Sequence, residues 1–323
     1  MKKQLIIDLE NGEISTNYFN DYDQIDIEFE SLNFQASKLS GYEIIGINRL
    51  NVFSNDKNSK VGGFFSHYLK CNNYDIISFK GKSPKPVFIY INKEEVGIYD
   101  AESFFFNDYK ESRRYIENIL NRTNLEICSI SYAGAYKVDF SKIMFGENKS
   151  CGKNGLGKLM GEKNLKSIVL EKQKTLELKD KEFLNKLNKN ISSKLNNNKD
   201  ITSYFCDSNN CYGCNINCKS TSIKKLINKG IVLSKAEEID KICNEYGMDS
   251  IAFSQFINDK QSLTELANEI IKNPQDYRVE NNINNRKEKK EDKLDEFGFC
   301  KFLINKNIIT NEELENLIKI IES

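Results

Sequence analysis

The feature that most constrains this chain is a run of three cysteines in its second half, Cys211-Tyr-Gly-Cys214-Asn-Ile-Asn-Cys218. Three thiolates at this spacing cannot all point at one atom from a regular helix. They can surround a cuboidal iron–sulfur cluster if the backbone turns sharply. Gly213 supplies the conformational freedom for such a turn. We therefore predict a metal-binding loop at this position.

A cuboidal cluster needs a fourth ligand, which normally comes from a distant segment. Cys300 is the best candidate, because it follows Gly298 and has apolar neighbours. Cys206, five residues before the run, is the rival. Structural zinc also takes four cysteines, so the spacing alone leaves zinc as an alternative. Chance occurrence in a lysine- and asparagine-rich loop is the third reading. The remaining cysteines are expected to be ordinary buried thiols: Cys71, Cys128, Cys151 and Cys243.

Composition narrows the possible functions. The chain has nine cysteines but no apolar stretch long enough for a signal peptide or a membrane span, so we expect a cytoplasmic protein with reduced thiols. Lysine plus arginine and aspartate plus glutamate are both 47, which gives no electrostatic case for nucleic acid or an anionic membrane as partner. The single histidine, His67, excludes any mechanism that needs two histidines from this chain. We expect it to be structural or exposed.

The hydrophobic pattern changes about halfway along the chain. Apolar runs separated by glycine and asparagine turns predict strands at 4–8, 42–47, 75–80, 86–91 and 96–99, the last two as a hairpin. Helical spacing predicts helices at 176–195, 234–246, 262–272 and 311–321, with Ser234 as an N-cap and Gly247 ending that helix. Residues 280–293 read as a charged linker. The predicted class is α+β, with a β-rich domain of twisted sheets at 1–171 and a helical domain carrying the iron–sulfur site at 172–323.

A glycine-rich loop follows Cys151, with glycines at 152, 155, 157 and 161. Such loops bring the backbone close to another group, and phosphate is the usual guest because exposed amides bind anions. Residues 152–158 fit part of a P-loop, but Leu159 stands where a magnesium-binding serine or threonine is required. A dinucleotide fingerprint fails because the strand follows the loop. We predict a loop that holds a phosphorylated cofactor, with a purely structural glycine loop as the alternative.

These segments together resemble the aldehyde ferredoxin oxidoreductase family of tungsten–pterin enzymes. The loop from Lys153 reads Lys-Asn-Gly-Leu-Gly-Lys-Leu-Met-Gly-Glu-Lys-Asn-Leu-Lys-Ser-Ile, which is similar to the family loop Arg-Gly-Gly-Leu-Gly-Ala-Val-Met-Gly-Ser-Lys-Asn-Leu-Lys-Ala-Ile. Residues 62–70 and 81–87 resemble the family's N-terminal domain in the same order. The segments 243–250 and 295–300 look like its two pterin-contacting motifs, and the second also supplies the fourth cluster cysteine.

The resemblance implies a set of cofactors and ligands. It favours iron–sulfur over zinc and Cys300 over Cys206, so a [4Fe-4S] cluster would be held by Cys211, Cys214, Cys218 and Cys300. Two pterin dithiolenes would hold tungsten, or molybdenum, and electrons from an oxidised aldehyde would pass through the cluster to ferredoxin. Asp249 and Asp295 would accept hydrogen bonds from pterin N–H groups. The alternative is that they are carboxylates at helix ends. The implied pterin contacts are Lys153, Asn154, Gly155, Leu156, Gly157, Asn244, Gly247, Met248, Asp249, Asp295, Gly298 and Phe299.

The chain also departs from the family pattern. Lys153 replaces an arginine, which keeps the charge but loses bidentate phosphate binding. A Gly-Gly-Arg-Gly segment expected near 18–40 is absent, and the family's C-terminal domain is reduced to about 277–294. No catalytic residue can be named. We keep three hypotheses: a compact aldehyde-oxidising enzyme, a degenerate member that serves as an iron–sulfur electron-transfer or assembly subunit, and a scaffold with a structural metal. A second chain could supply the missing part.

Overall fold

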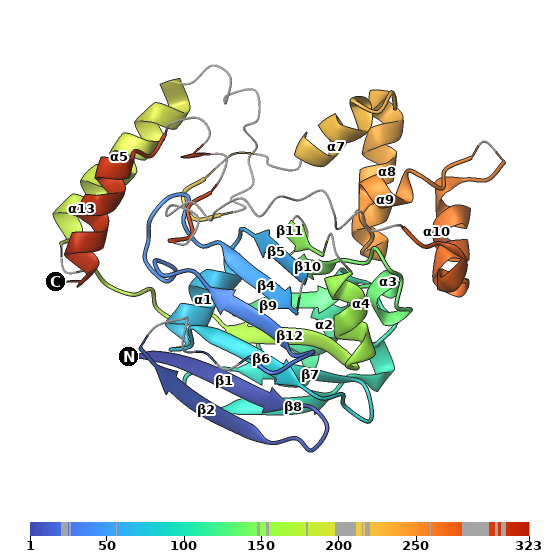
Figure 1. Ribbon diagram of the computed structural model, residues 1–323, viewed down its shortest axis with the longest axis horizontal. Helices are drawn as coiled ribbons and strands as arrows, with labels where there is room; N and C mark the ends of the chain where they lie inside the picture. Colours follow the sequence, from blue (N-terminus) through green and yellow to red (C-terminus); the bar gives the residue numbers. More distant parts are fainter. Residues whose placement is uncertain are drawn as a thin grey trace.

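In a computed structural model, the described residues form two six-stranded mixed sheets followed by helices (Figure 1). The α+β class predicted from the sequence is therefore confirmed. No helix in the described part of the chain has the length and apolar character that a membrane crossing requires. The structure describes residues 1–323 except for 21–24, 26, 56, 147–148, 153–154, 179, 198–210, 215, 217–219, 259, 280–296, 301–302, 305–307 and 323.

The first sheet has the strand order β2-β1-β6-β3-β4-β5. An antiparallel hairpin, β1–β2, forms one edge, and β1 pairs in parallel with β6. The remaining neighbours are antiparallel, and helix α1 connects β5 to β6. The elements are β1 (Lys2–Asp8), β2 (Ile14–Phe19), β3 (Leu32–Ala36), β4 (Leu50–Ser54), β5 (Lys57–Val61), α1 (Phe65–Cys71) and β6 (Ile76–Lys80).

The second sheet has the order β11-β10-β9-β12-β7-β8. The hairpin β7–β8 is confirmed, with Ile89 opposite Ile98. Strand β12, which follows the glycine loop, pairs in parallel with β7 and antiparallel with β9. The elements are β7 (Val87–Ile91), β8 (Val96–Asp100), η2 (Glu102–Phe104), α2 (Tyr109–Leu120), β9 (Leu125–Ile130), α3 (Tyr132–Ala135), β10 (Ile143–Phe145), β11 (Lys149–Cys151), α4 (Leu156–Glu162) and β12 (Leu165–Glu171).

One hydrophobic core joins the two sheets. Helix α1 lies between them and contacts β3 of the first sheet as well as β9 and β12 of the second. Its Phe65 packs edge-on against Phe145, with ring centroids 5.4 Å apart, and also contacts Phe34. Strand β7 is buried along its whole length, as its continuous apolar run Val-Phe-Ile-Tyr-Ile predicts for a central strand.

The helices that follow β12 form two separate groups, one of α5 and α13 and one of α7 to α10 (Figure 1). Helices α5 and α13 pack together, and the Lys194 ammonium lies 3.0 Å from the Glu313 carboxylate between them. Helices α7 to α10 share a second apolar cluster. The elements are α5 (Lys181–Asn197), α7 (Ser220–Ile227), α8 (Leu233–Tyr246), α9 (Ser250–Phe253), α10 (Leu263–Lys272), η3 (Pro274–Asp276) and α13 (Asn311–Glu322).

Three local predictions are wrong. The helix predicted at 176–195 begins only at Lys181, where α5 starts. Residues 42–47 form an irregular loop and not a strand, because Gly41 and Gly46 adopt φ values of 99° and 85° that a strand does not allow. Helix α8 begins one residue earlier than predicted, so Val232 and not Ser234 occupies its N-cap. Gly247 does end α8, with a φ of 74°. The predicted linker at 280–293 lies outside the described residues.

A buried lysine links the second sheet to α2. Lys166, fully buried on β12, donates from its Nζ to the backbone carbonyls of Asn107 and Ile130 at 2.7 and 2.6 Å. Burial lowers the pKa of Lys166 from 10.5 to about 7, although the charges of Asp108 and Glu111 oppose this shift. Between about pH 7 and pH 10.5, Lys166 binds a proton in the unfolded chain but not in the folded chain. This group therefore makes the folded protein more stable as pH rises through that range.

We expect Lys166→Met to flatten the pH dependence of stability above pH 7. The slope lost should approach about 1.4 kcal/mol per pH unit well above pH 7, because one proton is then exchanged on unfolding. Urea unfolding at about pH 7, 8 and 9 measures it. Lys158→Met is the control, since Lys158 is partly exposed and pairs with Asp139, and its slope should match that of the wild type. A wild-type slope that survives in Lys166→Met would contradict the prediction.

Candidate functional site

The cysteine run begins with a tight turn. Cys211 and Cys214 form an isolated antiparallel bridge, and the Cys214 amide donates to the Cys211 carbonyl at 3.1 Å. Gly213 has a φ of 58°, the left-handed conformation that the turn requires. The sharp bend predicted from the sequence is therefore present. Cys218 and its rival Cys206 lie outside the described residues.

A short loop, Ile45-Gly46, connects the turn to the distant Cys300. A Cβ on Gly213 would stand 2.8 Å from the Ile45 side chain, so the turn packs directly on this loop. On its other side, the Gly46 carbonyl accepts a hydrogen bond from the Cys300 amide at 2.6 Å. The two cysteine segments, far apart in sequence, thus pack on adjacent residues of one loop.

Three of the four predicted cluster ligands lie among the described residues, and they share one apolar environment. Cys214 is buried, and Cys211 and Cys300 are partly buried against the same hydrophobic cluster, which also contains Phe299. Gly298 fits closely over Ser37, and its carbonyl accepts from the Arg49 amide at 3.4 Å. Gly298 therefore lies against residues 37 and 49, and Phe299 lies with Cys300 in the same hydrophobic cluster. Among the described residues, no group of three or more histidine, cysteine, aspartate or glutamate side chains is arranged to hold a metal ion.

The other described cysteines have the character of ordinary core thiols. Burial raises the pKa of Cys71 to about 11, and it raises the pKa values of Cys128, Cys151 and Cys243 even further. A thiol that stays protonated at neutral pH is a poor metal ligand and a poor nucleophile. These four cysteines therefore behave as predicted.

The described glycines of the loop at 152–161 approach protein backbone. A Cβ on Gly152 or Gly157 would stand 2.8 Å from backbone atoms of Lys142, and one on Gly155 would stand 2.6 Å from the Asp139 carbonyl oxygen. Gly161 on α4 is closer still, because its Cβ would stand 2.0 Å from the Gly134 oxygen. At these positions close packing against protein backbone explains the glycines, which is the alternative of a purely structural loop. Lys153 and Asn154 lie outside the described residues, and Leu156 is buried in the core.

The segment 247–249 docks on the other side of the same backbone stretch. The Gly247 carbonyl accepts from the Lys142 amide at 2.7 Å, Met248 forms a bridge with Ser141, and the Asp249 amide donates to Phe140 at 2.9 Å. The structure thus brings the glycine loop and the 247–249 motif together around residues 139–142. The Ser141 hydroxyl is fully buried there, and the described part of the chain offers it no hydrogen-bond partner. Sequence reasoning missed Ser141, because nothing in its local pattern marks it.

Asp249 serves as the N-cap of α9. Its Oδ1 accepts hydrogen bonds from the amides of Ile251 and Ala252, both at 3.0 Å. This is the helix-end role that was the alternative to pterin binding. Asp295, the second predicted carboxylate, lies outside the described residues.

We expect Asp249→Ala to lower the free energy of unfolding by about 1 kcal/mol, the usual loss for an N-cap. Asp249→Asn keeps an oxygen acceptor and should stay within about 0.5 kcal/mol of the wild type. Urea unfolding of both variants at one pH provides the measurement. Equal losses in the two variants would show that the charge, and not the cap, is what matters.

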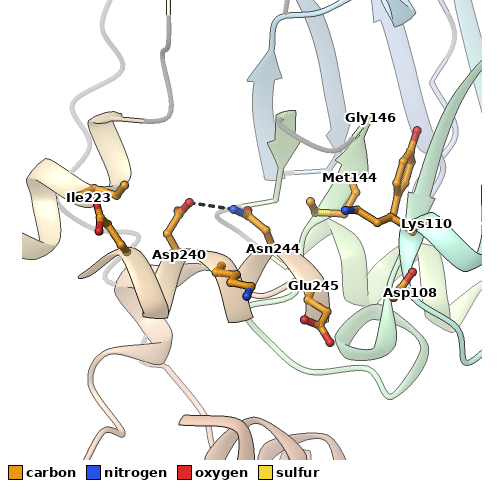
Figure 2. Close-up of a pocket in the computed structure, with 11 residues that line it drawn as sticks. Asp108, Lys110, Met144, Gly146, Ile223, Asp240, Asn244 and Glu245 are labelled. Atoms are coloured by element: carbon orange, nitrogen blue, oxygen red, sulfur yellow. Dashed lines mark hydrogen bonds between the residues drawn. The ribbon is translucent and has the colours of Figure 1, made fainter. Parts of the chain in front are cut away.

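A pocket of about 400 Å³ separates α8 from α2 and β10 (Figure 2). Asn244, predicted to contact pterin, lines it and donates from Nδ2 to Asp240 at 2.9 Å. Figure 2 shows these two side chains pointing toward one another across one turn of α8. Asn244 thus lines the pocket. The other members of its predicted motif, Gly247, Met248 and Asp249, contact residues 140–142 instead. The pocket is also lined by Asp108, Tyr109, Lys110, Met144, Gly146, Ile223, Glu237, Lys241 and Glu245.

Comparison with known proteins agrees with the arrangement of the sheets. Residues 28–172 match the family described as aldehyde ferredoxin oxidoreductase, N-terminal domain. The chain is 38% identical over 120 residues to the tungsten-containing aldehyde ferredoxin oxidoreductase of Pyrococcus horikoshii, and 36% identical over 141 residues to that of Pyrococcus furiosus. These matches cover 37% and 44% of this chain, but only 20% and 23% of the relatives.

Two further proteins are similar to this chain, one in sequence and one in structure. The WOR-like subunit of an aliphatic sulfonate oxidoreductase from Pyrococcus furiosus is 31% identical over 146 residues, which are 40% of this chain and 23% of that subunit. The active-site complex BamBC of benzoyl coenzyme A reductase has the same fold, with a TM-score of 0.69 at 20% identity over 84% of this chain and 60% of that one. Residues 28–172 therefore belong to the aldehyde ferredoxin oxidoreductase family, as its N-terminal domain.

Proposed function

We propose that this chain is an iron–sulfur redox protein in which Cys211, Cys214, Cys218 and Cys300 hold one [4Fe-4S] cluster. The observation that carries the proposal is the packing of the Cys211–Cys214 turn and of Cys300 on the adjacent residues Ile45 and Gly46. Thiolates are the donors that such clusters use, and an apolar surrounding limits the access of water. When bound, the cluster would supply a one-electron relay.

The electron acceptor in this proposal is a ferredoxin or a similar small carrier, and the chain acts as the electron-transfer subunit of a larger assembly. The names of the relatives support both parts. One is a subunit of an oxidoreductase, another is a two-component active-site complex, and several are ferredoxin oxidoreductases. A partner chain would supply the part of the relatives that this chain does not match.

Aldehyde oxidation by this chain itself, with tungsten or molybdenum bound to pterin, is the second candidate. The convergence of the glycine loop and the 247–249 motif on residues 139–142 favours it, together with the buried Ser141 hydroxyl, which has no partner among the described residues. The described residues fit a pterin poorly, however. The loop glycines close on protein backbone and Asp249 caps a helix, so we derive no catalytic step through that cofactor.

Metal analysis of anaerobically purified protein tests the proposal. We expect about four iron and four acid-labile sulfide per chain, with a broad visible absorption that bleaches on reduction. Stoichiometric tungsten or molybdenum with pterin would support the second candidate. Zinc in place of iron would contradict both and leave a scaffold with a structural metal.

A further inference from the structure

His67 is a buried imidazole that none of the roles above uses. It lies on α1, is 2% exposed, and is the only histidine in the sequence. Its Nδ1 is buried and has no hydrogen-bond partner among the residues that the structure describes. The ring packs edge-on against Tyr68, with centroids 4.9 Å apart. A buried nitrogen without a partner lowers stability, so a role in function would account for its presence.

Glu43 connects His67 to the cysteine turn. Burial lowers the pKa of His67, and the negative charge of Glu43 acts in the opposite direction. The same carboxylate accepts a hydrogen bond from the Tyr212 hydroxyl at 3.3 Å, and Tyr212 lies between Cys211 and Cys214. The Glu43 carboxylate therefore acts electrostatically on the imidazole and is hydrogen-bonded to the turn.

A second contact joins α1 to the same turn. Gly62 stands three residues before α1 begins, and a Cβ on it would lie 3.5 Å from the Cys211 sulfur. The neighbouring Ser66 hydroxyl donates to the Arg49 carbonyl, and the Arg49 amide in turn donates to Gly298. Helix α1 is thus linked to the segments of both Cys211 and Cys300.

The other charged and titratable groups around α1 are engaged elsewhere. Lys70 pairs with Asp75, and the Lys172 ammonium lies 5.9 Å from the centre of the Tyr68 ring. Cys71 is held as a thiol by burial, and Glu126 acts on Tyr68. The pKa of His67 is thus shifted by two causes, its burial and the negative charge of Glu43.

We infer that His67 takes up one proton when the neighbouring cluster gains one electron. This inference rests on the proposed function. Reduction adds a negative charge to an apolar region, where an unbalanced charge is costly, and a positive imidazolium nearby offsets it. The electron comes from the redox partner, and the proton comes from solvent and binds at Nδ1 of His67. On oxidation the electron leaves to the carrier and the proton returns to water.

Redox titration of the iron-loaded protein from about pH 5 to about pH 8, followed by electron paramagnetic resonance of the reduced cluster, tests this inference. The wild-type midpoint potential should fall with rising pH, by up to about 59 mV for each tenfold fall in proton concentration. His67→Gln should abolish the dependence, with His67→Asn as a second variant if the first folds poorly. Glu43→Gln should move the pH-dependent range of the potential to lower pH.

Glu126→Gln is the control. Burial raises the pKa of Glu126 to about 7, but this residue lies on β9 and acts on Tyr68. Its potential should follow that of the wild type.

The outcomes separate the two proposals. A loaded cluster whose potential shows the same pH dependence in the wild type and in His67→Gln overturns the role of His67 and leaves the cluster in place. Loss of the dependence in Glu126→Gln, with its retention in His67→Gln, overturns it as well. A protein without iron contradicts the proposed function, and this inference with it.

Discussion

Replacing Cys214 or Cys300 with alanine is expected to remove nearly all iron and acid-labile sulfide from anaerobically purified protein. Each cysteine would supply one of four thiolates, and the donors come from two segments that meet only in the folded chain. Losing either one opens the cluster to water and to loss of iron. Iron and sulfide per chain, with the visible absorption, provide the measurement.

Matched cysteine variants serve as controls. Cys71→Ala and Cys243→Ala remove buried thiols that burial keeps protonated, and they should retain the iron content of the wild type. Cys206→Ala distinguishes the rival ligand, and it should also retain iron. Full iron content in both Cys214→Ala and Cys300→Ala would contradict the proposed cluster. Loss of iron in Cys206→Ala, with retention in Cys300→Ala, would exchange the two ligands.

Much of the sheet structure follows from local sequence. The hairpin β7–β8 and the strand β12 are apolar runs between turn residues, and such patterns need no long-range information. The loop at 42–47 has an equally apolar sequence but is not a strand. Its isoleucines are buried against the helical cluster that contains Phe299 and Leu303, more than 250 residues away. A tertiary partner at that distance in sequence cannot be seen in a short hydrophobic run.

The candidate site divides in a similar way. The turn at Gly213 follows from a glycine between two cysteines, and the sequence predicts it correctly. The shared support at Ile45 and Gly46 has no local signal, because neither residue belongs to a recognisable motif. Glu43 is also unremarkable in the sequence, and its importance comes from the groups that the fold places beside it.

Gly161→Ala should lower the free energy of unfolding by about 3 kcal/mol or more, which is a larger loss than that expected for Asp249→Ala. The new Cβ would stand 2.0 Å from the Gly134 carbonyl oxygen and 2.9 Å from its carbon, so helices α3 and α4 would have to separate. The contact is with backbone, which cannot move aside as the end of a flexible side chain can. Urea unfolding, with the midpoint and the slope both fitted, provides the measurement.

Gly230→Ala is the matched control for this substitution. Gly230 has a φ of 89°, and a Cβ added there would meet no atom of the described residues within 4 Å, so only backbone strain of about 1 kcal/mol is expected. The difference between the two variants isolates the cost of close packing between α3 and α4. Since α4 also carries Gly157 against Lys142, the same separation would disturb the stretch 139–142 on which the 247–249 motif docks. Equal losses in the two variants would mean that the helices can part easily, and that the glycines of this loop are kept for a bound group and not for packing.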